Sequence, residues 1–196
     1  RALVTLYMAT FGVFISTIIG FTVGIISFQN KHTANFMLGV CDIFQTFPSF
    51  VYLIPVMMLF GVTDTSVLIA VIVYATIPAT RYTIEGLRSV PEALHDAATM
   101  SGVTKVQRLL KIEFPLAFPH MMLGLNQTIV FALFMVIIGA FIGTEDLGQY
   151  ILKALSDKKG AGIGLTLGLC VAFIGLIFDH LIRTWVGKRK KHLGIG

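Results

Sequence analysis

The sequence predicts an all-α polytopic membrane protein, organised as one transmembrane domain over residues 1–196. Charged residues make up only 13% of the chain and hydrophobic residues 56%, with a mean hydropathy of +0.85. A soluble domain carries about 25% charged residues, because polar groups must cover its surface. The composition therefore excludes an ordinary soluble enzyme, a disordered chain and a nucleic-acid-binding module, and favours a chain that crosses a bilayer several times.

Uninterrupted apolar runs indicate where the membrane helices lie. Residues 2–30, 43–63, 65–80, 114–144 and 160–178 contain no Asp, Glu, Lys or Arg. A helix needs about 20 residues to cross the hydrocarbon core, because each residue adds about 1.5 Å. None of the runs alternates with a sustained period of two, which argues against membrane β-strands. We predict five membrane helices, at about residues 4–28, 36–61, 65–87, 119–143 and 162–186.

Lysine and arginine predict the orientation of these helices. Eleven of the 15 lie at Lys31, in the loop 81–118 or in the tail after residue 182, which five helices place on one side of the membrane. The other side holds the remaining four, Arg1, Lys153, Lys158 and Lys159. The positive-inside rule makes the first side cytoplasmic. The C-terminus is therefore expected in the cytoplasm.

Small residues recur every four positions along the first predicted helix, at Gly12, Ser16, Gly20 and Gly24. This spacing places them on one face, where a second helix can approach closely. Packing within the chain and a seam between two copies of the chain would both use such a face. Pro48, Pro55 and Pro78 fall within the second and third helices, and membrane helices tolerate such breaks where neighbours or a cavity satisfy the freed carbonyls.

The polar loop at residues 89–118 carries signals for the start and end of helices. Residues 89–92 read Ser-Val-Pro-Glu, the pattern of a capping box with proline in the first turn, so a short helix is expected at about 90–100. Gly102 fits the left-handed backbone position that ends a helix. The first half of the loop is therefore expected to be a helix and a tight turn.

The second half of the loop predicts another short helix. Residues 104–107 read Thr-Lys-Val-Gln, a second capping box, which opens a helix at about 105–112. Phe114-Pro115 is expected to break this helix from the next membrane helix. The two short helices would form a compact unit on the cytoplasmic face, which either packs on its own membrane helices or inserts into a partner's groove.

This loop resembles the EAA loop of ABC importer permeases, written EAA-x3-G-x9-I-x-LP. The chain reads Asp-Ala-Ala at 96–98, then Gly102, Ile112 and Phe114-Pro115, and every spacing matches. Asp replaces Glu and Phe replaces Leu, which keeps the acidic and the apolar character. The resemblance implies that this loop couples the chain to an ATPase subunit. The implied coupling residues are Glu92, Asp96, Ala97, Ala98, Gly102, Ile112 and Pro115.

Three further segments, 45–55, 124–129 and 142–149, are similar to the glycine betaine/proline betaine/choline branch of these permeases. The resemblance implies the five-helix core of a type I ABC importer, located in the bacterial cytoplasmic (inner) membrane, that imports a quaternary-ammonium or betaine-type osmolyte. The implied partners are an ABC ATPase dimer, a second permease copy, an extracytoplasmic solute-binding protein and the lipid bilayer. ATP and Mg²⁺ would be used by the ATPase, and the chain itself is expected to bind no cofactor.

The residues themselves support this division of labour. The chain has no G-x-x-x-x-G-K-[ST] phosphate-binding loop, no Cys/His cluster at metal-ligand spacing and no expected catalytic residue. Polar and aromatic groups within the spans are candidates for lining a solute path: Gln45, Thr46, Phe50, Tyr52, Asn126, Gln127 and Thr128. The polar ones would serve equally in hydrogen bonds between helices. Ring faces, including those of Phe47, Phe50 and Phe131, would suit a quaternary ammonium group.

Two alternatives remain at this point. A permease for methionine or another small solute would share the EAA loop and the five-helix core. An ion-coupled secondary transporter belongs to a different class and would place ionisable groups near the middle of the bilayer. Asp42 and Asp179 instead lie close to the predicted cytoplasmic ends of their helices, which argues against ion coupling.

Overall fold

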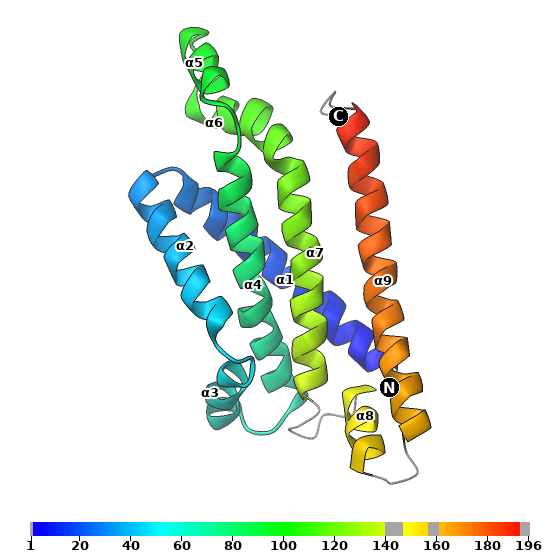
Figure 1. Ribbon diagram of the computed structural model, residues 1–196. Helices are drawn as coiled ribbons and strands as arrows, with labels where there is room; N and C mark the ends of the chain where they lie inside the picture. The colour runs from blue at the N-terminus through cyan, green and yellow to red at the C-terminus, as the bar shows by residue number, and fades with distance from the viewer. Residues whose placement is uncertain (1, 140–146, 157–160, 193–196) are drawn as a thin grey trace.

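The computed structural model describes residues 2–139, 147–156 and 161–192, and none of them forms a β-strand. The all-α prediction is therefore confirmed. The elements, drawn in Figure 1, are α1 (Ala2–Phe28), α2 (Lys31–Thr46), α3 (Phe50–Phe60), α4 (Asp64–Arg88), α5 (Glu92–Met100), α6 (Lys105–Arg108), the π-helix η1 (Leu109–Glu113), α7 (Phe114–Gly139), α8 (Leu147–Ser156) and α9 (Ala161–His192).

Among the described residues, four helical segments are long and apolar enough to cross a membrane. They are Leu3–Phe28, Asp64–Arg88, Lys105–Gly139 and Gly162–Trp185, and the bent pair α2–α3 makes a fifth if it is one broken span. The last residues of the predicted helix 119–143, and part of the segment 142–149, lie outside the described residues. The short helix α8 was not predicted.

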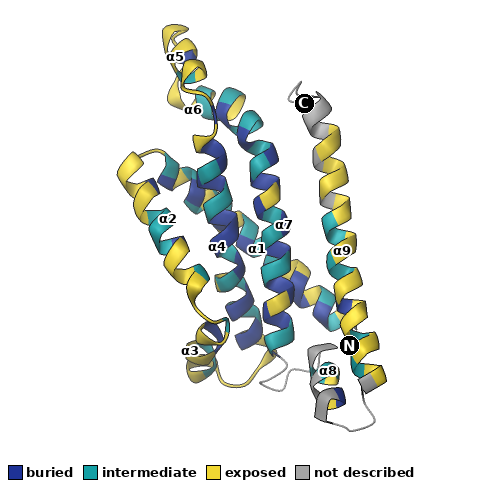
Figure 2. Cartoon of the chain, in the orientation of Figure 1, coloured by how far each residue is buried: buried dark blue, intermediate teal, exposed yellow. Residues whose placement is uncertain are grey.

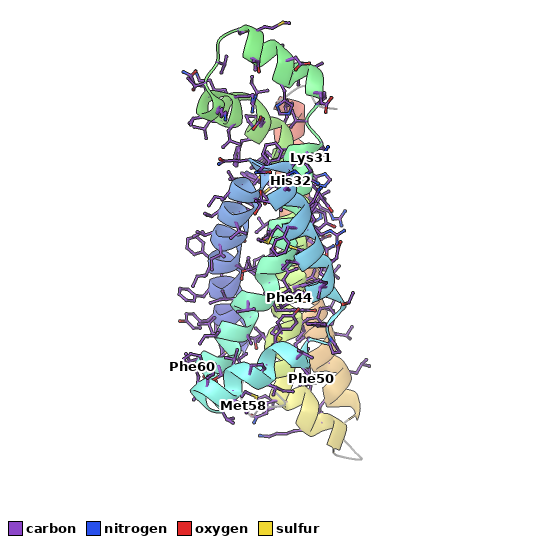
Figure 3. All side chains as sticks on the ribbon, turned by 90° about the vertical axis from the view of Figure 1, so that its left-hand side faces the viewer. Lys31, His32, Phe44, Phe50, Met58 and Phe60 are labelled. Carbon is purple, nitrogen blue, oxygen red and sulfur yellow. The ribbon has the colours of Figure 1, made fainter. Side chains whose placement is uncertain are left out.

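The second predicted helix, 36–61, is wrong as one continuous element. The structure has α2 and α3, which meet at 90°. The chain leaves the helix at Phe47, whose φ of −71° and ψ of 136° are extended. Phe47 precedes Pro48, and the proline ring disfavours helical backbone in the residue before it. Figure 3 shows the result, with Lys31 and His32 at the start of α2 near the loop between α4 and α7, which we call the coupling loop after its predicted role. Phe50, Met58 and Phe60 lie on α3 at the opposite end.

The centre of the bundle is α4, which packs between α1 and α7, and α4 and α7 contribute 13 buried residues each (Figure 2). The small residues of α1 face α4 of the same chain. A Cβ atom on Gly20 would lie 2.4 Å from the Cβ of Ala79, and one on Gly24 would lie 2.6 Å from the Cβ of Thr83. Ser16 Oγ donates a hydrogen bond to the Ile72 carbonyl at 3.0 Å. The stripe of small residues is therefore a seam within the chain.

The loop between α4 and α7 differs from its prediction at its start but agrees with it at the second capping box. Ser89 forms no capping box: Pro91 is the N-cap residue without a side-chain bond, and Ser89 Oγ donates to the Gly86 carbonyl at 2.7 Å. Ser89 still belongs to the end of α4, so its hydroxyl bonds backward. The second capping box is confirmed, because Thr104 accepts from the Gln107 amide while the Gln107 side chain accepts from the Thr104 amide.

The predicted break at Phe114-Pro115 is wrong. The chain stays helical from α6 through η1 into α7. In η1 the Phe114 amide bonds to the Leu109 carbonyl, five residues back, instead of four. A proline inside an α-helix lacks an N–H and clashes with the carbonyl four residues back. The wider π turn before Pro115 gives that carbonyl room, and π-bulges of this kind occur within longer helices.

The last helix, α9, contacts α7 and α8 and is exposed along most of its length (Figure 2). Many of its exposed side chains are apolar, among them Leu165 at 68% and Phe173 at 59% exposure. Apolar side chains on the outside of a helix of this length suit contact with lipid tails.

Candidate coupling loop and candidate solute path

The coupling loop projects from one end of the bundle (Figure 1). Its first helix, α5, ends in the tight turn predicted at Gly102, which has a φ of +71°. The Gly102 amide donates to the Thr99 carbonyl at 3.1 Å and the Val103 amide to the Ala98 carbonyl at 3.2 Å. A Cβ atom at Gly102 would have open space around it, with nothing within 4 Å in the described part of the chain beyond its two neighbours. The positive φ, and not a lack of space, therefore favours glycine here.

The predicted coupling residues fall into two groups. Four of them line one cavity of about 500 Å³ beneath α5, namely Ala97, Ala98, Ile112 and Pro115. Ala98 is 3% exposed, so the small residue at this position is explained by packing within the loop, whereas Ala97 at the edge of the cavity is exposed. Glu92 and Asp96 do not line this cavity and are exposed. Gly102 is exposed as well.

Glu113 is a buried carboxylate within the loop that the sequence did not predict as functional. It is 2% exposed, and its Oε1 atom accepts a hydrogen bond from Arg108 Nε at 2.8 Å. His95 Nδ1 on α5 lies 3.0 Å from the same oxygen. The three side chains connect α5 to the start of the membrane helix. Arg108 and Glu113 are five residues apart, and the π turn between them brings such a pair onto one face.

A second cavity, of about 310 Å³, lies between α2, α4 and α7. It is lined by Gln45, Pro78, Arg81, Tyr82, Glu85, Gln127 and Phe131. The structure thus brings together two of the seven predicted path residues, Gln45 and Gln127, and adds the ring of Phe131. We call this cavity the α2–α4–α7 cavity.

The other five predicted path residues do not line this cavity. Thr46 and Thr128 donate their hydroxyl hydrogens to carbonyls of their own helices, at 2.7 Å to Ile43 and 2.9 Å to Gly124. Tyr52 donates to the Phe44 carbonyl across the bend between α2 and α3.

Asn126 and Phe50 also lie elsewhere. Asn126 Nδ2 donates to Asp179 Oδ1 on α9 at 2.6 Å, an interhelical bond of the kind considered as the alternative role. Phe50 is 44% exposed at the start of α3. The sequence therefore identified the polar side chains within the membrane spans, but it did not show which of them line the cavity.

Arg81 is a cavity residue that the sequence pattern placed in a loop. It lies inside α4, where its Nη1 atom donates to Asp42 Oδ1 at 2.6 Å and to Gln45 Oε1 at 3.0 Å, both on α2. Its Nε atom donates to Glu85 Oε1 at 2.9 Å. The Arg81–Glu85 spacing of four residues is a recognisable helical ion pair. The link to Asp42 spans 39 residues and had no local signal.

Stacked aromatic rings continue from the cavity wall. The Phe131 ring stacks on Tyr74 with centroids 4.7 Å apart and an interplanar angle of 19°. Tyr74 in turn contacts Tyr52 at 5.0 Å. The cavity therefore offers a guanidinium, two carboxylates nearby, two amides and ring faces within one small volume.

Comparison with known proteins assigns the chain to a family. The family model for the binding-protein-dependent transport system inner membrane component matches residues 12–192. The chain is 46% identical over 195 residues to the trimethylamine N-oxide transport system permease protein TmoV of Ruegeria pomeroyi, covering 100% of this chain and 30% of that protein. It is 32% identical over 186 residues to the glycine betaine transport system permease protein OpuAB of Bacillus subtilis, covering 95% of this chain and 66% of that protein.

The solved structures agree on the fold. The chain superposes on the inward-facing MetNI methionine ABC transporter with a TM-score of 0.84 at 19% identity, covering 96% of this chain and 94% of that one. This likeness supports the predicted type I importer core. It is a similarity of fold alone. On the family match, the chain belongs to the inner membrane components of binding-protein-dependent transport systems.

Proposed function

We propose that the chain is the permease part of an ATP-driven importer for a small methylated-amine or betaine-type osmolyte. The identity of 46% to the trimethylamine N-oxide permease, over the whole of this chain, carries the proposal. The second relative is a glycine betaine permease, whose solute has the same trimethylammonium group. The chain spans between 30% and 66% of the length of these two relatives.

The α2–α4–α7 cavity supports a dipolar solute of this kind. A trimethylammonium group has no N–H to donate, so ring faces and a nearby carboxylate suit it better than directed acceptors. Tyr82, Phe131 and Glu85 provide these groups. A primary amine such as that of methionine would instead need acceptors for three N–H groups.

The coupling loop supports an ATPase partner. Met100 at 90%, Val106 at 65% and Leu110 at 61% exposure present apolar side chains on a loop that projects beyond the bundle. Exposed apolar side chains grouped on a projecting element are typical of a protein–protein interface. In our proposal this loop docks on a cytoplasmic ATPase subunit, which uses ATP and Mg²⁺, and the permease chain carries out no covalent chemistry.

The remaining parts of the assembly follow from the same proposal. Two permease copies would enclose the path, an extracytoplasmic binding protein would deliver the solute, and the C-terminus would lie in the cytoplasm. Closure of the ATPase dimer would draw the two coupling loops together and turn the path outward. Family membership in a binding-protein-dependent system favours this cycle over coupling to an ion gradient.

The test is uptake into vesicles that contain the full importer with its ATPase and binding protein. We expect accumulation of labelled trimethylamine N-oxide, glycine betaine or choline that requires ATP and is lost when ADP replaces it. Vesicles with methionine as the labelled solute are the control. Accumulation of methionine, with none of the methylated amines, would contradict the proposal.

A further inference from the structure

The charge arrangement around Arg81 is unusual for a membrane-spanning chain. Ionisable side chains within membrane helices are rare, and they are usually placed at substrate or ion pathways. Here Arg81 on α4 bonds to Asp42 and Gln45 on α2 and to Glu85 one helical turn away, and all three pairings are within 3.0 Å. Arg81, Gln45 and Glu85 line the α2–α4–α7 cavity, and Asp42 lies just outside its lining. A site of this kind calls for a ligand with complementary charge.

The cavity matches a solute with a cationic and an anionic end. Liquid water takes up about 30 Å³ per molecule, so 310 Å³ holds a solute of about five to eight non-hydrogen atoms together with some water. One guanidinium and two carboxylates leave a negative balance, which favours a methylated ammonium against the rings of Tyr82 and Phe131. The side-chain amide of Gln45 can donate to an oxygen at the other end.

Arg81 holds its two carboxylates with different parts of the guanidinium. Nε bonds to Glu85, on the same helix, while Nη1 bonds to Asp42 and Gln45, on α2. The side chain of Asp42 is 59% exposed, so few groups of this chain hold it and it can turn away when the bond to Arg81 opens. The side chain of Glu85 is only 34% exposed and is held by Arg81 from the same helix. The Nη1 edge is therefore the part of Arg81 that a competing oxygen can take.

We propose that the α2–α4–α7 cavity is a solute subsite in which the carboxylate or N-oxide oxygen of a methylated amine displaces Asp42 from Arg81. This inference rests on the proposed function, and it adds a position and an orientation for the solute. The ammonium end lies against Tyr82 and Phe131, and the oxygen end lies on Nη1 of Arg81. Because the displaced bond joins α2 to α4, occupancy of the site also releases a link between these helices.

The experiment measures protection of a cysteine in the cavity. The purified permease–ATPase complex carries Gln127→Cys and Cys170→Ser, and a small thiol reagent modifies residue 127 in the presence of glycine betaine, trimethylamine N-oxide or choline. A ligand present at ten times its dissociation constant slows the reaction about tenfold, because only the empty fraction reacts. Sucrose at the same osmolality controls for general effects of osmolytes on packing.

Arg81→Lys is the decisive variant and Arg88→Lys its matched control. Lysine keeps the charge but has one ammonium group in place of the separate Nε and Nη1 donors, so it cannot hold Glu85 and the solute oxygen in the same geometry. We expect Arg81→Lys to lose protection by glycine betaine while protection by choline, which has no anionic oxygen, remains. Arg88 also bridges α4 to α2, through Asn35 Oδ1 at 2.7 Å, but does not line the cavity. Arg88→Lys is expected to keep both protections.

Asp42→Asn is expected to strengthen protection by glycine betaine, whereas Arg81→Lys weakens it. Removing the competing charge is expected to lower the glycine betaine concentration that gives half-protection. The comparison is made in the protein that carries Gln127→Cys and Cys170→Ser. Equal protection by glycine betaine with Arg81 and with Arg81→Lys would overturn the subsite. Equal loss with both solutes, or the same loss in Arg88→Lys, would also overturn it, since Arg81 would then only hold the helices together.

Uptake by the unsubstituted importer separates this inference from the proposed function. Vesicles that take up none of the methylated amines would refute the proposed function. Vesicles that take them up, from a complex whose residue 127 no methylated amine protects, would refute the subsite alone.

Discussion

Neutralising Glu113 should loosen the coupling loop without disturbing the membrane helices. The carboxylate is 2% exposed and holds Arg108 at 2.8 Å and His95 at 3.0 Å. Glu113→Gln keeps the size and one acceptor oxygen but removes the charge. The interactions that connect α5 to the base of α7 are therefore weakened, while the packing of α4 and α7 within the bundle is unchanged.

The expected loss of free energy depends on how far Glu113 and its two partners are buried. A hydrogen bond to a charged group contributes about 1.5–3 kcal/mol. The side chains of Arg108 and His95 are 30% and 22% exposed, so solvent screens part of this energy. A local loss of about 1–2 kcal/mol remains, which corresponds to a change of roughly 5- to 30-fold in an equilibrium constant.

Hydrogen exchange of the assembled importer measures this directly. Amides of α5 should exchange roughly 5 to 30 times faster in Glu113→Gln, since local opening sets their protection. Amides of α4 should be unchanged. Lys111→Gln is the control, because it neutralises an exposed charge in the same π turn. We further expect fewer solute molecules transported per ATP hydrolysed, because a loosely held coupling helix transmits ATPase closure less effectively.

Unchanged exchange of α5 in Glu113→Gln would refute the reasoning, since the carboxylate would then not hold the helix. Equal acceleration in Lys111→Gln would also refute it, because loss of any charged side chain in the turn would then loosen α5.

Four further outcomes are expected. Gly102→Val should cost about 1–3 kcal/mol of backbone strain at a φ of +71° and reduce transport. Gly102→Asn should retain most of the transport, because asparagine tolerates this conformation. Equal transport rates in the two variants would show that backbone strain at this position does not limit transport. Gly20→Leu should lower the thermal denaturation midpoint, because its Cβ would lie 2.9 Å from the Thr80 backbone nitrogen and overpacking costs about 1–3 kcal/mol. An impermeant thiol reagent added outside cells should label Val62→Cys and miss Lys105→Cys, and the reverse result would invert the topology. Asn126→Leu should destabilise the protein by only about 0.6 kcal/mol and leave solute preference unchanged, as expected for an interhelical bond; an altered preference in uptake assays would place Asn126 in the path.

Local hydrogen bonding and bilayer thickness made several features predictable from the sequence. The apolar runs marked most of the membrane spans, since about 20 apolar residues are needed wherever a helix meets lipid. The turn at Gly102 and the capping box at Thr104 were also predicted, because each depends on residues within a few positions of one another. The EAA spacing is also a feature of neighbouring residues, because Ala97, Ala98 and Ile112 belong to one loop and line one cavity.

The sequence determined that the chain forms apolar helices joined by a polar loop with a capped helix, and only the tertiary structure decided which side chains these helices bring together. Gln45 and Gln127 were visible as polar groups in apolar spans, but their common cavity wall, with Arg81 added, depends on how α2, α4 and α7 rotate against one another. The pairing of Arg81 with Asp42 across 39 residues and of Glu113 with Arg108 across a π turn is decided in the same way. Local patterns set backbone conformation through neighbouring hydrogen bonds, whereas a site is made by contacts between distant residues that only the packed bundle brings into reach.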